Sequence, residues 1–170
     1  MDLREWIRDV PDFPRQGIIF KDITTLLKDK SGFQRAIDLF LRHYRDRKID
    51  QVVAIESRGF IFGSVLAYEL GTGFIPIRKP KKLPARIERV EYELEYGTDC
   101  LEIHADALEP GQQVLIIDDL LATGGTASAV VQLVEKLGAD VVSLGFLIEL
   151  TFLKGRDKLP GQDILALIQY

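Results

Sequence analysis

The sequence predicts an α/β protein in which a mostly parallel, twisted sheet is flanked by helices. Two observations carry this prediction. Short apolar runs rich in β-branched residues alternate with stretches of helical period, as in strand–helix–strand units. Glycines end several of the helical stretches, and polar loops follow the apolar runs. The chain has 170 residues, of which 46% are hydrophobic and 28% charged, so we expect one domain spanning residues 1–170.

The amino-terminal part precedes this alternation. A short helix is predicted over residues 3–10 and ends before Pro11, whereas residues 12–25 contain breakers and are predicted to be irregular. A longer helix follows, with Ser31 as its N-cap. Its buried face is marked by Phe33, Ile37, Phe40, Leu41 and Tyr44.

From residue 51 onward, strand and helix periods alternate. Residues 51–55 form an apolar run typical of a buried strand, and residues 59–70 have helical period and end at Gly71. Because strands joined by helices run parallel, we expect a ligand site beyond their carboxyl ends. The remaining predicted elements are strands at 74–77, 114–117, 141–147 and 164–168 and a helix at 126–137.

Residues 79–104 interrupt the alternation and are highly charged. Alternating apolar residues in their second half (Val90, Tyr92, Leu94, Tyr96) predict a β-hairpin or flexible flap that stands off the sheet. Long loops in compact domains commonly act as lids. The first half carries cations that either form a solvated surface or attract a polyanionic ligand, namely Lys79, Lys81, Lys82, Arg86 and Arg89.

The most informative segment is VLIIDDLLATGGTA at residues 114–127, where a strand leads through a small-residue loop into a helix. Glycines let such a loop turn sharply, and the free N–H groups at the helix start attract phosphate. The loop lacks the lysine of a nucleoside-triphosphate loop and the three spaced glycines of a dinucleotide site. We therefore predict a site for a terminal monophosphate, formed by Ala122, Thr123, Gly124, Gly125 and Thr126.

Two aspartates, Asp118 and Asp119, stand beside this predicted anion site. Carboxylates accept hydrogen bonds from vicinal hydroxyls or reach a divalent cation through water. A sugar with a 5′-phosphate and free 2′ and 3′ hydroxyls satisfies both features, whereas the alternative is a strand end with capping residues. A second helix-start anion site is predicted at Glu56-Ser57-Arg58-Gly59, where Arg58 supplies a permanent positive charge.

Residues 114–127 closely resemble the phosphoribosyl pyrophosphate signature of type I phosphoribosyltransferases. Further segments resemble the adenine phosphoribosyltransferases in particular, so that the resemblance covers nearly the whole chain. These segments are DFP and GIIFKDIT within residues 12–24, ESRGFIFG at 56–63, YELEYG at 92–97, DALEPG at 106–111 and ELTFLKGR at 149–156.

The resemblance implies a type I phosphoribosyltransferase fold with a small base-binding hood at residues 1–30 and a flexible flap at residues 79–104. It implies that adenine attacks 5-phosphoribosyl 1-pyrophosphate to give AMP and pyrophosphate. It also implies Mg²⁺, bound mainly through the donor pyrophosphate and water near Asp118, and a homodimer. An oxocarbenium-like transition state follows from the departure of pyrophosphate from an anomeric carbon.

Site residues are implied at the matching positions. Glu95 would be the general acid or base and Tyr96 would help close the site, while Asp118 and Asp119 would face the ribose hydroxyls. The loop 122–126 would hold the 5′-phosphate. Pyrophosphate would meet Ser57, which follows a cis peptide in this family, together with Arg58, Arg78 and Lys79. Adenine would contact Ile19, Phe20, Lys21 and Leu150, and Lys21 replaces an arginine typical of the family.

Composition narrows the function classes. The net charge of −4 argues against a nucleic-acid partner. The chain has a single cysteine and no leader-like or membrane-spanning apolar run, which favours a cytoplasmic protein without membrane association. The alternatives are a phosphoribosyltransferase for guanine, hypoxanthine or xanthine, a non-catalytic regulator with this fold, and a phosphosugar-binding module.

Overall fold

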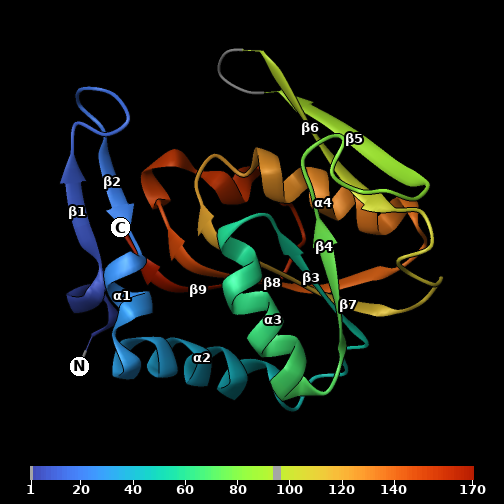
Figure 1. Cartoon of the computed structure of the whole chain (residues 1–170), viewed down its shortest axis with the longest axis horizontal. Coiled ribbons are helices and arrows are strands. Elements are labelled where there is room, and N and C mark those ends of the chain that lie inside the picture. Colours follow the sequence, from blue (N-terminus) through green and yellow to red (C-terminus); the bar gives the residue numbers. More distant parts are fainter. Residues whose placement is uncertain (1, 94–96) are drawn as a thin grey trace.

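The computed structural model describes residues 2–93 and 97–170 and confirms the predicted α/β fold. Its centre is a five-stranded, wholly parallel sheet with the strand order β4-β3-β7-β8-β9 (Figure 1). In the described part of the chain, no helix is long and apolar enough to cross a membrane. The strands are β3 (Gln51–Ile55), β4 (Gly73–Ile77), β7 (Gln113–Leu121), β8 (Asp140–Glu149) and β9 (Ile164–Gln169).

Alternation along the central strands divides the core into two layers. On one face of the sheet, Val53 and Ile116 pack in a cluster with α4 (Gly125–Lys136). On the other, Val52 and Leu115 pack with the helices α2 and α3. All four side chains are fully buried, and each such burial contributes about 1.5–3 kcal/mol. The covering helices of the second face are α2 (Lys30–Tyr44) and α3 (Arg58–Leu70).

The amino-terminal segment differs from its prediction. A 3₁₀ helix spans only Leu3–Trp6, and the chain then enters strand β1 (Arg8–Pro11) instead of continuing a helix to residue 10. Strand β1 pairs antiparallel with β2 (Ile19–Asp22), inside the stretch that was expected to be irregular, and α1 (Thr24–Lys28) follows. Cross-strand contacts decide the outcome: the Nε of Arg8 donates to Asp22 at 3.0 Å. The sequence pattern for this helix was therefore misleading.

Two boundaries also move. Helix α2 begins at Lys30 because Asp29, not Ser31, caps it by accepting a hydrogen bond from the Gly32 N–H at 2.8 Å. Strand β7 continues past residue 117 to Leu121, so Asp118 and Asp119 lie within the strand. The longer strand follows from pairing with β8, which extends to Glu149.

A separate antiparallel hairpin rises from the sheet beside α4 (Figure 1). It consists of β5 (Ile87–Glu93) and β6 (Thr98–His104). Val90 and Tyr92 pack against the core cluster of α4, whereas Glu91 and Glu93 are exposed, as the alternation predicts. The hairpin is therefore confirmed, while Leu94 and Tyr96 lie outside the described residues.

Candidate active site

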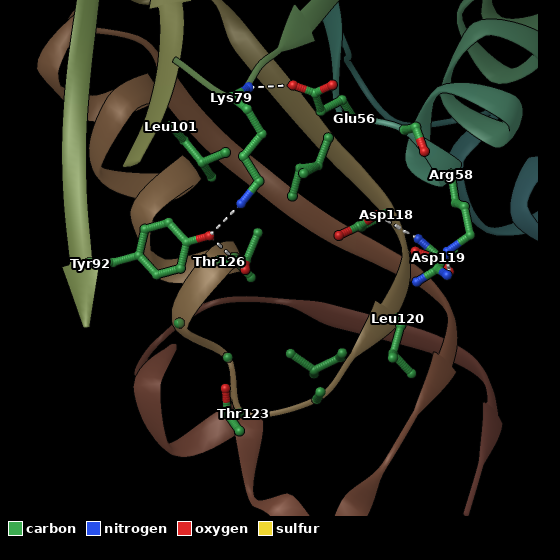
Figure 2. A pocket seen from close by; sticks show the side chains of 17 residues that line it. Glu56, Arg58, Lys79, Tyr92, Leu101, Asp118, Asp119, Leu120, Thr123 and Thr126 are labelled. Carbon is green, nitrogen blue, oxygen red and sulfur yellow. Dashed lines mark hydrogen bonds and ion pairs between the residues drawn. The ribbon is translucent and has the colours of Figure 1, made fainter. Parts of the chain in front are cut away.

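A pocket of about 370 Å³ opens at the carboxyl ends of β3 and β7 (Figure 2). The turn from β3 into α3 and the loop from β7 into α4 supply most of its lining, and Lys79 and the hairpin close the remaining side. The lining residues are Ile55, Glu56, Ser57, Arg58, Lys79, Tyr92, Leu101 and residues 118–127. The structure thus brings both predicted anion sites to one edge of the sheet.

The loop at residues 122–126 is held by backbone packing. Gly124 has a φ of +81°, and a Cβ added to it would lie 2.2 Å from the carbonyl oxygen of Gly155. A Cβ on Gly155 would in turn lie 2.4 Å from the carbonyl oxygen of Ala122. Only glycines permit this close approach. The first N–H groups of α4, which starts at Gly125, have no partner within the helix and suit a phosphate.

The segment next to this loop supplies a cation, Lys158, that the sequence pattern did not indicate. The Nζ of Lys158 lies 3.9 Å from the position of a Cβ on Gly125. Its 3₁₀ helix, Gly155–Lys158, is fixed by Arg156, which donates to both oxygens of the buried Glu149 at 2.7 and 2.8 Å. These hydrogen bonds lower the pKa of Glu149. The motif ELTFLKGR contains both Glu149 and Arg156, but its local pattern does not predict that this segment lies against the loop 122–126.

The two aspartates have different surroundings. The Nε of Arg58 lies 2.6 Å from Oδ2 of Asp119, so the Asp119 carboxylate forms an ion pair with Arg58. Burial, and then the charge of Asp119, raise the pKa of Asp118 well above its ordinary value of 3.8. Gly59 permits the arrangement, because a Cβ there would lie 2.9 Å from Oδ1 of Asp118. The pocket therefore presents one carboxylate that is paired and one that resists ionisation.

A third carboxylate organises the cationic side of the pocket. The Glu56–Ser57 peptide is cis, as the family resemblance implied. The side chain of Glu56, 9% exposed, accepts hydrogen bonds from the Lys79 backbone N–H and from Nζ of Lys82, the latter at 2.7 Å. Burial opposes ionisation of Glu56, but these hydrogen bonds outweigh it and hold its pKa below the ordinary value. Arg78 lies 3.5 Å from the same carboxylate. The sequence pattern alone indicates no role for Glu56.

The predicted base-contacting residues do not line this pocket. Lys21 forms an ion pair with Asp9 at 2.7 Å, and its Nζ lies 3.8 Å from the ring centroid of Tyr170. Phe20 is linked to the site through Arg58, whose guanidinium carbon lies 5.6 Å from the Phe20 ring centroid. Ile19 is 55% exposed and Leu150 is half-buried, whereas Glu95 and Tyr96 lie outside the described residues.

The donor atoms suit a hard cation that is bound chiefly through its substrate. No group of three or more His, Cys, Asp or Glu side chains that could hold a metal occurs within residues 2–93 and 97–170. Mg²⁺ commonly keeps several waters and takes one or two carboxylates together with substrate phosphates. Asp118 lines the pocket, and a cation there would offset the repulsion from Asp119 that raises the pKa of Asp118, so the residues present fit that mode of binding.

Comparisons with known proteins agree with the geometry. Residues 22–161 match the phosphoribosyl transferase domain family. The chain is 62% identical over 169 residues to the adenine phosphoribosyltransferase of Solibacter usitatus, covering 99% of this chain and 98% of the relative. The solved adenine phosphoribosyltransferase of Thermoanaerobacter pseudethanolicus is 56% identical, with a TM-score of 0.96 over 99% of this chain and 98% of that chain. The Saccharomyces cerevisiae enzyme, solved with adenine and an imino-altritol bisphosphate, is 43% identical, with a TM-score of 0.92 over 97% and 96% of the two chains.

Proposed function

The chain belongs to the phosphoribosyltransferase family, among the adenine phosphoribosyltransferases, and from this premise we propose how its pocket carries out the reaction. The reaction joins adenine to 5-phosphoribosyl 1-pyrophosphate, the donor, and yields AMP and pyrophosphate in purine salvage. The observation that carries the proposal is one pocket that combines the loop 122–126, the adjacent Asp118 and Asp119, and the cations Arg58 and Lys79. Those groups match the three parts of the donor.

The 5′-phosphate is assigned to the loop 122–126. The start of α4 and the hydroxyls of Thr123 and Thr126 supply donors there, and Lys158 adds a positive charge close by. Asp118 and Asp119 take the ribose hydroxyls, which lie between the two phosphate ends of the donor. This order along the pocket accounts for acidic residues next to an anion site.

The pyrophosphate is assigned to Ser57, Arg58 and Lys79, with Arg78 alongside. Arg58, whose side chain is 44% exposed, releases part of its contact with Asp119 and turns to the ligand. Mg²⁺, bound to the donor near Asp118, would add positive charge to the departing pyrophosphate. The cations of this chain stabilise that same developing charge.

Adenine is assigned to the space between the amino-terminal hood, residues 1–30, and the flap, residues 79–104. The backbone of Ile19, Phe20 and Lys21 contacts the purine edge, and Leu150 packs on its ring. Glu95 exchanges a proton with the purine, and Tyr96 helps to exclude water when the flap closes. The sugar passes through an oxocarbenium-like transition state, whose positive charge favours the ionised forms of Asp118 and Asp119 and is stabilised by them.

The chain is further proposed to be a cytoplasmic homodimer. Several large apolar side chains are exposed in the described structure, including Phe13, Ile19 and Phe152, which suits burial against a second copy. Sedimentation velocity tests this proposal. A species of twice 19.2 kDa supports it, and a monomer at all concentrations contradicts it.

A turnover assay tests the proposed function. The purified chain is mixed with the donor, Mg²⁺ and adenine, guanine, hypoxanthine or xanthine, and nucleotide and pyrophosphate are followed. We expect turnover with adenine alone, because the sequence next to Glu149-Leu150-Thr151 carries no cation before Lys154, and Arg156 is paired with Glu149 in the described structure. Turnover only with a 6-oxopurine would overturn the base assignment. Donor binding without any turnover would favour a non-catalytic regulator.

A further inference from the structure

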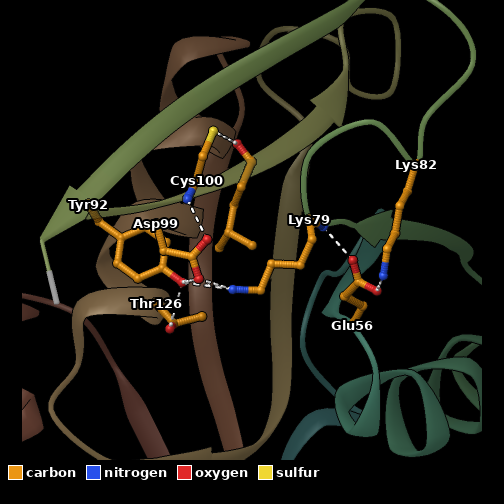
Figure 3. Close-up of polar contacts among 8 residues, drawn as sticks. Glu56, Lys79, Lys82, Tyr92, Asp99, Cys100 and Thr126 are labelled. Carbon is orange, nitrogen blue, oxygen red and sulfur yellow. Dashed lines mark hydrogen bonds and ion pairs between the residues drawn. The ribbon is translucent and has the colours of Figure 1, made fainter. Parts of the chain in front are cut away.

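An ion pair joins the hairpin to the pyrophosphate side of the pocket (Figure 3). Nζ of Lys79 donates to Oδ2 of Asp99, on β6. The same oxygen accepts a hydrogen bond from the hydroxyl of Tyr92, on β5, at 3.2 Å. The Tyr92 hydroxyl lies 3.4 Å from Nζ of Lys79 and 3.5 Å from the hydroxyl of Thr126, in the first turn of α4. The network therefore touches both phosphate ends of the pocket.

The two partners differ in how firmly they are held. Asp99 is fixed through its other oxygen, which accepts the Cys100 backbone N–H at 2.8 Å. Lys79 is fixed at its main chain through Glu56, whereas its side chain is 41% exposed and is held by Asp99 and Tyr92. Lys79 lines the pocket, whereas Asp99 is not one of its lining residues. The long lysine side chain can therefore turn from Asp99 toward a ligand without moving the backbone.

The charges of Lys79 and Asp99 allow Lys79 to turn from Asp99 to an anionic ligand. Burial works against the cation, but hydrogen bonds with Asp99 and Tyr92 outweigh it and hold the pKa of Lys79 above its ordinary value. The pKa of Asp99 is lowered, because the hydrogen bonds from Lys79 and Cys100 outweigh its own burial. Both groups are thus charged at neutral pH, and an incoming pyrophosphate meets a cation that already has an anionic partner.

We propose that Asp99 is a positioning residue that holds Lys79 while the pyrophosphate site is empty, and exchanges Lys79 with pyrophosphate when the site fills. This inference rests on the proposed assignment of Lys79 to pyrophosphate. A pyrophosphate carries more charge than one carboxylate and displaces Asp99. When pyrophosphate departs, Asp99 recaptures Lys79, which weakens the hold on the product. The contact between β6 and the end of β4 therefore depends on the occupancy of the site.

The binding of pyrophosphate with Mg²⁺ to the full chain, measured by calorimetry, tests the exchange. In Asp99→Asn the competing charge is gone, so we expect pyrophosphate to bind roughly two- to fivefold tighter, the range for a partly exposed ion pair. KM for adenine should not change. Glu91→Gln is the matched control, because Glu91 lies opposite Cys100 on the same hairpin and is exposed. It should leave the affinity as in the wild type, and Asp99→Ser should reproduce Asp99→Asn.

A double-mutant cycle separates the exchange from a general charge effect. In a Lys79→Gln background, Asp99→Asn should leave pyrophosphate affinity unchanged. Equal tightening in both backgrounds would overturn the proposal, and so would weaker binding by Asp99→Asn alone, since Asp99 would then only support Lys79. A wild type that neither binds pyrophosphate nor turns over adenine would mark failure of the proposed function. An active wild type with unaltered affinity in Asp99→Asn would mark failure of the exchange alone.

Discussion

At the scale of single residues, adjacent positions in one strand acquire different chemistry. Asp119 is nearly buried and paired with Arg58, whereas Asp118 is desolvated and repelled by Asp119. A charge kept in such surroundings costs folding free energy. Stability therefore does not explain this position, which is consistent with the role toward the ribose that we propose for Asp118.

Replacing Asp118 should separate these two effects. We expect Asp118→Asn to lower kcat/KM roughly 10²-fold, as when a group that stabilises transition-state charge is removed, while raising the free energy of unfolding at neutral pH. Because the folded pKa of Asp118 is raised, its contribution to stability is fully present below 3.8 and is lost as pH rises through the raised value. The advantage of the variant should therefore grow with pH.

Kinetics with adenine and urea unfolding of the substrate-free chain at acidic and slightly alkaline pH provide the measurement. The same pair of measurements on Glu69→Gln, an exposed position on α3, serves as the control. Near-normal kinetics in Asp118→Asn would remove Asp118 from the ribose site. A stability gain that does not vary with pH would refute the electrostatic explanation.

At the scale of elements, the loop between β7 and α4 is defined by contacts of backbone on backbone. Gly124→Ala should destabilise the chain by about 1–3 kcal/mol, because its φ is +81° and its Cβ would meet the Gly155 carbonyl at 2.2 Å. Gly125→Ala is the matched control for folding, since its Cβ would make an ordinary contact of 3.5 Å with the Tyr92 ring. Thermal unfolding of both variants checks the difference. Equal melting temperatures would contradict the packing account.

The junction after β3 depends on Glu56. Glu56→Gln should lower the free energy of unfolding by about 1 kcal/mol at neutral pH, because charged hydrogen bonds with the Lys79 backbone and Lys82 are lost. The folded pKa of Glu56 is lowered, so its contribution is present above 4.5 and disappears as pH falls through the lower value. Urea unfolding from pH 7 to acid should show the two proteins converge. A constant difference would point to packing instead.

Some of the helices and strands could be predicted from the sequence, and others could not. The phosphate loop and the alternating sheet were predictable because glycine, strand and helix patterns are local. Strand β1 was not, because its state depends on pairing with β2, and a short apolar pattern suits either period. The site shows the same division between local and distant information. Asp118 was predictable, because the residues next to it in the sequence identify it. Glu56, Asp99 and Lys158 act through contacts with distant segments, which no local pattern records.

At the scale of the whole molecule, the net charge bears on how strongly the chain attracts its anionic donor. The chain has a net charge of −4, yet its donor is a polyanion. The cations at the start of the flap were one possible source of electrostatic steering. In the structure three of these five cations are already paired, through Lys79–Asp99, Lys82–Glu56 and Arg89–Glu102. Arg78, just before them, also lies against Glu56. Paired charges produce little field at long range.

Donor capture should therefore depend only weakly on ionic strength. Between about 20 and about 200 mM NaCl, we expect kcat/KM for the donor to fall less than about threefold, whereas steered association falls by tenfold or more. KM for adenine, which is uncharged, corrects for other effects of salt. A steep fall would mean that the flap cations act together over distance despite their partners. A small fall in kcat/KM would mean that these cations act on pyrophosphate only at short range, inside the pocket. There pyrophosphate must compete with the carboxylates that are paired with the cations.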